Sequence, residues 1–281
     1  MFSCLPLLLL TAQAALAAPP LAERLETWKR EIEQRGEQLV VARIETDRET
    51  NQVRVPPDTP RRVILARFLS NEQFRGQFLQ THAMTLNYRA AEGRVHFVLL
   101  NMARAAEFKD AEEPLLAHEF GHAWLDEQGF RSSDYAAEAQ PCLAIHASDI
   151  VQHVLIRRAL NERGILFREY WTRNLALALD ALRKDGPPSS SSACELLART
   201  ALWTDVRLGL TPDAWSRHGE FDAAFRRSFP ELAATVDELV TVLNAVDVTA
   251  RERYQRALAY VKRRLAVTAG IEESPAGPPS L

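Results

Sequence analysis

The strongest constraint on the fold of this chain is an apolar helical stretch that is interrupted by two histidines and a glutamate. It runs from Pro114 to Asp126 and reads Pro-Leu-Leu-Ala-His-Glu-Phe-Gly-His-Ala-Trp-Leu-Asp. Residues four apart lie one above the other on a helix, so His118 and His122 can offer ring nitrogens to a single ion. Glu119 then projects beside that ion. The stretch therefore predicts a buried helix that carries a metal site.

The surroundings of this pattern support the prediction. Five residues of this kind occur by chance in about one chain in a hundred of ordinary composition, so the context has to decide. Apolar residues flank the polar triplet, and Gly129 follows where a helix C-cap is expected. Residues 94–101 before it have the pattern of a strand. A strand followed by a histidine-bearing helix is expected where an extended substrate lies along a sheet edge above a metal.

With this context, the segment from His118 to Ala123 resembles the active-site helix of the zincin metallopeptidases, most closely the gluzincin-like group. The resemblance covers residues 94–130 and no particular family over the whole chain. It implies a zinc ion held by His118 and His122, with Glu119 as general base and proton shuttle.

A third metal ligand is expected on the next helix, because catalytic zinc sites usually have three protein ligands. His146, Asp149 and His153 are spaced i, i+3 and i+7, so they share one helix face. Gluzincins use a carboxylate on a following helix, and we therefore predict Asp149 as the third ligand. His153 is the alternative, either as ligand or as hydrogen-bond partner of a ligating histidine. Glu138 is a further candidate, and for His146 an ordinary polar surface position is the simpler interpretation.

A zinc peptidase also needs a side chain that stabilises the oxyanion of the tetrahedral intermediate. Tyr170, Tyr135 and the histidines are candidates, and nothing in their spacing selects one. For each tyrosine, ordinary packing with a satisfied hydroxyl group is the simpler interpretation.

The N-terminal residues predict export. Residues 1–17 form an apolar run that closes on Ala15-Leu-Ala, which is typical of a secretory signal with an A-x-A cleavage site. We expect a secreted or periplasmic protein without a stable membrane anchor. An oxidising compartment permits disulfides, and removal of the signal leaves only Cys142 and Cys194. We expect these two to pair, with two buried free thiols as the alternative.

The whole chain predicts a mainly helical α+β protein. A zincin-like small N-terminal sheet with the active-site helix is expected within residues 18–186, followed by a flexible serine-rich loop at 187–193. A helical C-terminal region at 194–270 and a disordered tail at 271–281 complete the chain. The formal charge is −3 and no long basic run occurs, so neither a nucleic-acid nor a membrane-surface partner is indicated.

Hydrophobic periodicity and turn residues predict the elements along the chain. Ser70 is a possible N-cap, and Pro212 stands in the first turn of a short helix. The predicted helices are 21–36, 61–69, 70–82, 114–126, the stretch ending at Gly164, 167–184, 194–208, 211–217, 230–246 and 249–268, and the strands are 38–46, 51–55, 84–88 and 94–101.

Together these features predict an exported zinc metallopeptidase with a peptide or protein substrate. The alternative is a non-catalytic, zinc-stapled helical scaffold or partner-binding protein. In it, Asp149 and His153 would both bind zinc and close the site to water. Glu119 favours the enzyme, because a closed structural site does not require it. A third possibility is an enzyme whose N-terminal segment, before Pro56, covers the cleft.

Overall fold

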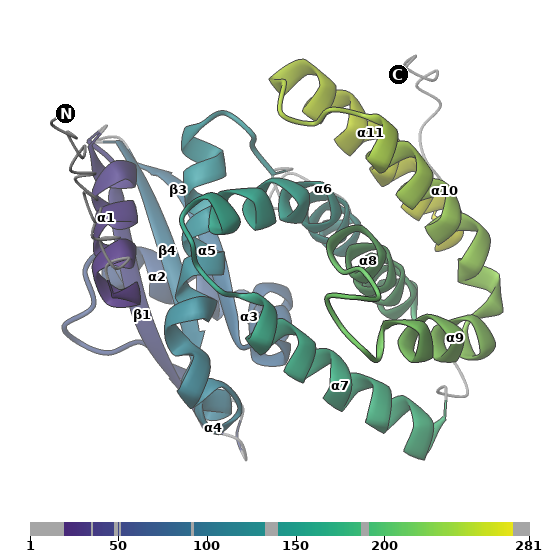
Figure 1. The fold of residues 1–281 in the computed structure, drawn as a ribbon. Helices are drawn as coiled ribbons and strands as arrows, with labels where there is room; N and C mark the ends of the chain where they lie inside the picture. The colour runs from purple at the N-terminus through teal and green to yellow at the C-terminus, as the bar shows by residue number, and fades with distance from the viewer. Residues whose placement is uncertain are drawn as a thin grey trace, which may run out of the picture.

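The computed structural model describes residues 20–34, 36–47, 50, 52–90, 93–132, 140–186 and 191–271 (Figure 1). The predicted signal peptide, all but the first residue of the predicted tail and most of the serine-rich loop lie outside these ranges. The described part has one four-stranded sheet in its first half, followed by helices. The mainly helical α+β class predicted from the sequence is confirmed.

The sheet has the strand order β2-β1-β4-β3. Its central strands β1 (Gln38–Thr46) and β4 (Gly93–Asn101) run parallel. The outer strands β2 (Val53–Arg54) and β3 (Ala83–Ala90) are antiparallel to their neighbours, and β3 and β4 form the predicted hairpin. β3 is therefore an edge strand.

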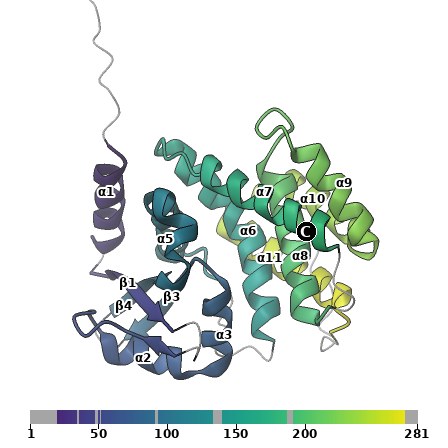
Figure 2. The ribbon, with the colours of Figure 1, turned by 90° about the horizontal axis from the view of Figure 1, so that it is seen from below.

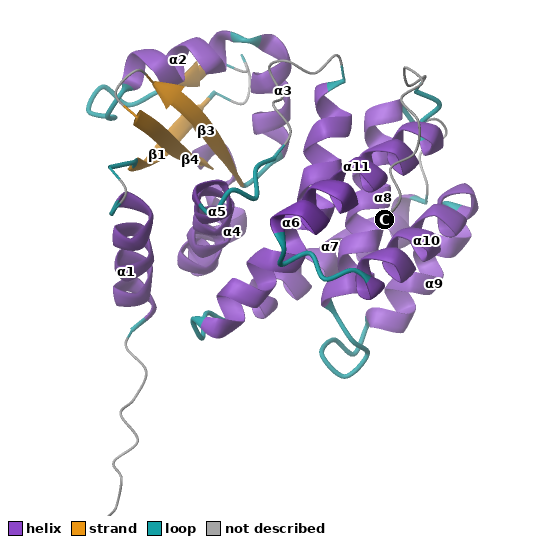
Figure 3. Ribbon diagram, turned by 90° about the horizontal axis from the view of Figure 1, so that it is seen from above, coloured by secondary structure: helices purple, strands orange, loops and turns teal. Residues whose placement is uncertain are grey.

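Each face of the sheet is covered by helices (Figure 3). Because side chains alternate along a strand, Ile44 and Phe97 enter one core while Val98 enters another. Both cores exclude solvent, so the sheet is a rigid base for the helices. The covering helices are α2 (Arg62–Ser70) and α3 (Glu72–Gln80) on one face, and α1 (Leu21–Glu33) and α5 (Glu112–Glu127) on the other.

The remaining helices gather on the side away from the sheet (Figure 2). α6 links the two halves, because it packs on α5 and also on α8 and α11. No helix in the described ranges combines the length and the apolar character that crossing a membrane requires. The helices on the side away from the sheet are α6 (Pro141–Glu162), α7 (Arg168–Asp185), α8 (Ala193–Gly209), α9 (His218–Ser228), α10 (Ala233–Ala245) and α11 (Arg251–Thr268). Short helical turns connect the longer elements: η1 (Met102–Arg104), α4 (Ala105–Phe108), η2 (Lys109–Ala111) and η3 (Pro230–Leu232).

Two local predictions are wrong. The N-cap of α3 is Asn71, whose side chain accepts a 3.0 Å hydrogen bond from the Phe74 amide, whereas Ser70 ends α2. Residues 211–217 form turns instead of a helix, since Trp215 is buried in the C-terminal core and a single turn does not nucleate a helix by itself. α9 follows these turns and was not predicted.

Two features stabilise the C-terminal end of α5. Gly129 has φ 83°, and its amide donates to Asp126 O at 3.0 Å while Phe130 donates to Leu125 O at 2.9 Å. These bonds form a Schellman motif, as the glycine predicted. The Arg94 guanidinium on β4 also lies 3.3 Å from the Asp126 carboxylate. It offsets acidic charge at a helix end where the macrodipole disfavours it.

The predicted disulfide between Cys142 and Cys194 is confirmed. The Cα atoms are 5.7 Å apart and the bond joins the first turn of α6 to the first turn of α8. It therefore couples the helix of His146, Asp149 and His153 to the C-terminal helices.

We expect the double substitution Cys142→Ser/Cys194→Ser to lower the free energy of unfolding by about 2–4 kcal/mol, because the bridge closes a long loop in the unfolded chain. Urea unfolding under non-reducing conditions measures the difference. A reductant should destabilise the wild type and leave the double variant unchanged. Equal stability of the two proteins without reductant would contradict this prediction.

Candidate metal centre

Three histidines from two helices converge between α5 and α6. One ring nitrogen from each of His118, His122 and His153 lies within 4.8 Å of the other two. The ring centroids of His118 and His153 are 4.7 Å apart, and those of His122 and His153 are 5.4 Å apart. The structure thus brings both α5 histidines together with the residue predicted as the alternative ligand. The group could hold a metal ion.

Asp149 and His146, the other α6 residues considered as ligands, are not part of this group. Asp149, the first choice from the sequence, is not in this group, and its carboxylate lies 4.0 Å from Nδ1 of His146. Both residues stand on α6 before His153, with their side chains half-buried. Glu138 and Tyr135 lie outside the described residues.

The tautomer of His122 is set by Gln152, a buried residue of α6. Nδ1 of His122 lies 2.9 Å from Gln152 Oε1, and Gln152 Nε2 donates to the Phe130 carbonyl at 2.9 Å. Because a carbonyl only accepts, this second bond orients the amide with Oε1 toward the histidine. Nδ1 of His122 therefore carries the hydrogen, and Nε2 keeps a lone pair for a metal ion.

His153 is oriented by a carboxylate from α8. Its Nδ1 lies 3.3 Å from Asp205 Oδ2, and Asp205 Oδ1 accepts a hydrogen bond from Arg157. Burial lowers the pKa of His153, but the charge and hydrogen bond of Asp205, together with the charge of Asp149, raise it by more, so the net pKa is raised. Burial raises the pKa of Asp205, yet its two cationic neighbours lower it by more. An ionised carboxylate behind a histidine is a common support for a zinc ligand.

His118 packs against Phe167 of the segment between α6 and α7. Its ring stacks on Phe167 with centroids 4.7 Å apart, and its Nδ1 is buried without a hydrogen-bond partner in the described part of the chain. Burial lowers the pKa of His118 well below its usual value and that of His122 to about 4. Neutral imidazoles are the form that binds metals, so the lowered pKa values suit His118 and His122 to zinc, and His153, whose pKa is raised, must be in its neutral form to bind the ion.

Glu119 lies beside the histidines with only 6% of its surface exposed. The Thr85 hydroxyl on β3 donates to its Oε2 at 2.7 Å. Burial raises the pKa of Glu119 to about 7, and the charge of Asp149 adds to the rise while the Thr85 bond opposes it. A carboxylate with a pKa in this range can accept and return a proton near neutral pH.

The glycine within the motif permits the close approach of the two helices. A Cβ added to Gly121 would lie 2.8 Å from Ile156 Cγ2 on α6. This distance is shorter than van der Waals contact allows, so any larger residue requires the Ile156 side chain or α6 to move. The distance from His118 and His122 to His153 therefore depends on Gly121.

Of the two tyrosines predicted as oxyanion candidates, Tyr170 lies in the described part of the chain. Its hydroxyl lies 2.7 Å from His82 Nδ1, and His82 Nε2 lies 3.0 Å from Glu107 Oε2. Burial raises the pKa of Tyr170 to about 12, and Glu119 adds to the rise. The hydroxyl group therefore keeps its proton and can act as a hydrogen-bond donor.

Two other groups of metal-capable side chains in the described ranges have different explanations. One includes the two sulfurs of the disulfide, which do not act as thiolate ligands while bonded to each other. The other contains two carboxylates that lie 3.3 and 2.9 Å from the Arg94 guanidinium. The groups are Cys142, His146 and Cys194, and His96, Asp126 and Glu127.

Three supporting residues were not predicted from the sequence. Asp205 and Thr85 lie far from the motif in the chain, on α8 and β3. Gln152 directly precedes His153, but a glutamine in a helix carries no signal of its own. Spacing within one helix could identify the histidines, whereas these contacts depend on how the elements pack.

No protein family matches this chain, and comparisons with curated proteins and with solved structures return no significant match. The site is a possible metal centre of three histidines beside a buried glutamate.

We expect the purified protein to bind about one zinc ion per chain, measured by competition with a chromophoric chelator. His118→Ala, His122→Ala and His153→Ala should each weaken binding by more than about 100-fold, since even residues that only orient a ligand cost about 10- to 100-fold. Asp149→Asn should keep the ion. The opposite pattern, with zinc lost in Asp149→Asn and kept in His153→Ala, would assign the third ligand to Asp149.

Gly121→Ala should destabilise the protein by about 1–3 kcal/mol, because the new methyl group overpacks the contact with Ile156. It should also weaken zinc binding by moving α6 away from α5. The matched control is Gly76→Ala in α3, where an added Cβ meets nothing within 4 Å. The control should gain stability from the higher helix propensity of alanine. Equal zinc affinity of both variants would refute the role of Gly121.

Proposed function

We propose that this protein is an exported zinc metallopeptidase, in which His118, His122 and His153 hold the ion and Glu119 is the general base. The observation that carries the proposal is the convergence of three histidines beside a buried carboxylate whose pKa is raised. Asp149 then contributes negative charge near the site. The disulfide supports an oxidising location, which a periplasmic or secreted protein would have.

His118, His122 and His153 would hold the ion, which would supply Lewis-acid chemistry and lower the pKa of a water molecule to about 7. Glu119 takes the proton of the attacking water and returns it to the leaving amine, so one carboxylate serves both halves of the reaction. Thr85 holds one oxygen of this carboxylate and thereby fixes its orientation. The near-neutral pKa of Glu119 suits a group that must both accept and release a proton.

Two features would position the peptide. β3 is an edge strand beside α5, and its outer backbone groups can pair with an extended chain. The Tyr170 hydroxyl group, which lies 2.7 Å from His82 Nδ1, would turn away from His82 to donate to the oxyanion that forms when the carbonyl is attacked. Both features favour a peptide as the substrate.

The alternative function is a structural zinc site that staples α5 to α6. Such a site would need four protein ligands, and the group of histidines supplies three. The fourth would have to be Asp149, whose carboxylate lies 4.0 Å from His146 Nδ1. The three-residue group and the nearby Glu119 both favour an open, catalytic site.

The segment before Pro56 does not suit a removable cover. It forms α1, β1 and β2, and it supplies Trp28 and Ile44, both fully buried, to two of the hydrophobic cores. Its removal would expose both cores, which favours an enzyme that is active without removal of this segment.

Glu119→Gln should keep zinc and lower kcat by about 10²- to 10⁴-fold, because the amide cannot accept the proton. Zinc content and cleavage of a mixed peptide library, followed by mass spectrometry, are measured on the same samples. Glu113→Gln is the matched control, since this exposed residue lies on the same helix and loses the same charge. A zinc-loaded wild type that cleaves no peptide would contradict the proposed function.

A further inference from the structure

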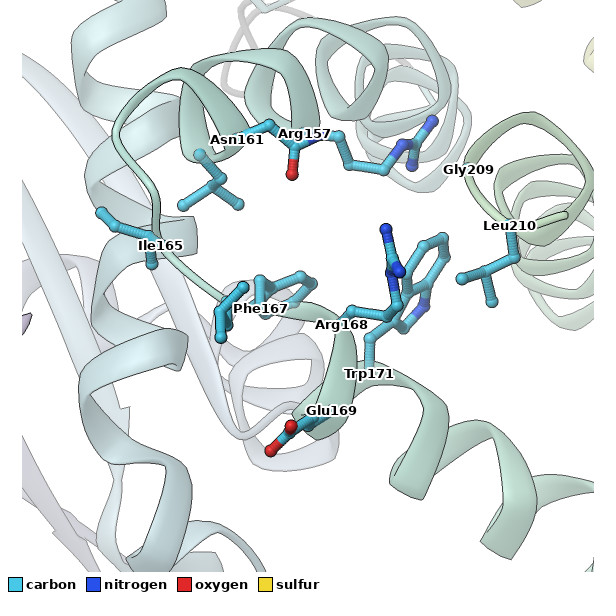
Figure 4. A pocket seen from close by; sticks show the side chains of 11 residues that line it. Arg157, Asn161, Ile165, Phe167, Arg168, Glu169, Trp171, Gly209 and Leu210 are labelled. Atoms are coloured by element: carbon cyan, nitrogen blue, oxygen red, sulfur yellow. The ribbon is translucent and has the colours of Figure 1, made fainter. Parts of the chain in front are cut away.

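A cavity of about 210 Å³ opens between the end of α6, the start of α7 and the end of α8 (Figure 4). Apolar and aromatic side chains form much of its wall, and two arginines reach into it. The lining residues include Ile165, Leu166, Phe167, Trp171, Arg157 and Arg168.

This cavity adjoins the metal centre through two shared residues. Phe167 lines it and also stacks on His118. Arg157 lines it and also bonds Asp205, the residue that orients His153. A ligand in the cavity would therefore lie next to any peptide bond held at the histidines.

The cavity is positively charged on one side. Figure 4 shows the side chains of Arg157 and Arg168 directed into the cavity, with the Glu169 carboxylate directed away. Arg157 forms an ion pair with Asp205. The Cζ atom of Arg157 lies 5.4 Å from the centre of the Trp171 ring. Within the described ranges, the guanidinium of Arg168 forms no ion pair. Arg168 therefore has its full donor capacity available for an anion.

The positions of Trp171 and Arg157 are fixed by the end of α8. A Cβ added to Gly209 would lie 2.5 Å from Trp171 Cη2 and 2.6 Å from Arg157 Nε. Only a residue without a side chain lets these two groups pack against α8. The fold thus fixes Trp171 and Arg157 in the wall of the cavity, whereas Arg168 is an exposed residue at its mouth.

We propose that this cavity is a specificity pocket that binds a carboxylate of the peptide substrate, with Arg168 as its main partner and Trp171 as its apolar wall. The proposal rests on the proposed peptidase function and names its substrate class. A guanidinium binds a planar carboxylate through two parallel hydrogen bonds, and the aromatic rings accommodate the carbon atoms next to it. An acidic side chain and the free C-terminus of a peptide present the same group.

The test uses pairs of synthetic peptides that differ by one carboxylate. In one set, glutamate is exchanged for glutamine at each position around the cleaved bond; in the other, the C-terminus is free or amidated. We expect one set to show a preference of about tenfold in kcat/KM for the carboxylate, since a charge-assisted hydrogen bond has this magnitude. Arg168→Gln should abolish the preference. Lys184→Gln, on the same helix and outside the pocket, should keep it.

Binding is measured separately from cleavage. The same peptides are titrated by calorimetry into zinc-loaded Glu119→Gln protein, with and without Arg168→Gln. Weaker binding of only the carboxylate peptides to the double variant supports the pocket, whether or not any peptide is cleaved. If no peptide is cleaved by the wild type, the peptidase function fails and calorimetry alone decides the pocket. Equal binding of acids and amides, or a preference that survives Arg168→Gln, would overturn the proposal.

Discussion

The close packing of α5 on α6 is the contact on which the candidate site depends. Two of its histidines come from α5 and the third from α6, so the distance between these helices decides whether three nitrogens can reach one ion. Gly121 sets this distance because its missing side chain leaves room for Ile156. The sheet fixes α5 from one side, and the disulfide and α8 fix α6 from the other. The rest of the fold holds these two helices in place.

Buried charge is balanced around this contact. Asp205 lies between His153 and Arg157, so α8 contributes both the orientation of a candidate ligand and part of the wall of the neighbouring cavity. A buried charged side chain without a partner would destabilise the protein by several kcal/mol, whereas a buried charge with partners is tolerated. Through Asp205, the helical C-terminal region contributes charge to the site.

The features that could be predicted from the sequence are those that depend on residues close together in the chain. The strands, most helices and the glycine after α5 follow from patterns within a few residues, and the disulfide follows from cysteine count and compartment. His118, Glu119 and His122 share one helix, so their spacing alone places them together. The prediction of Asp149 as the third ligand came from the resemblance to gluzincins. Which side chain of α6 faces the α5 histidines depends on the rotation of α6 relative to α5. That rotation depends on packing between distant segments, which one helix pattern cannot predict.

The central claim is that three imidazoles share one metal ion. Zinc-edge X-ray absorption on the zinc-loaded protein measures the ligands directly, because imidazole rings give a multiple-scattering pattern that carboxylates lack. The account predicts three imidazole nitrogens at about 2.0–2.1 Å and one further light atom, with one imidazole fewer in the His153→Ala protein. Two imidazoles with a carboxylate in the wild type, unchanged in His153→Ala, would contradict it.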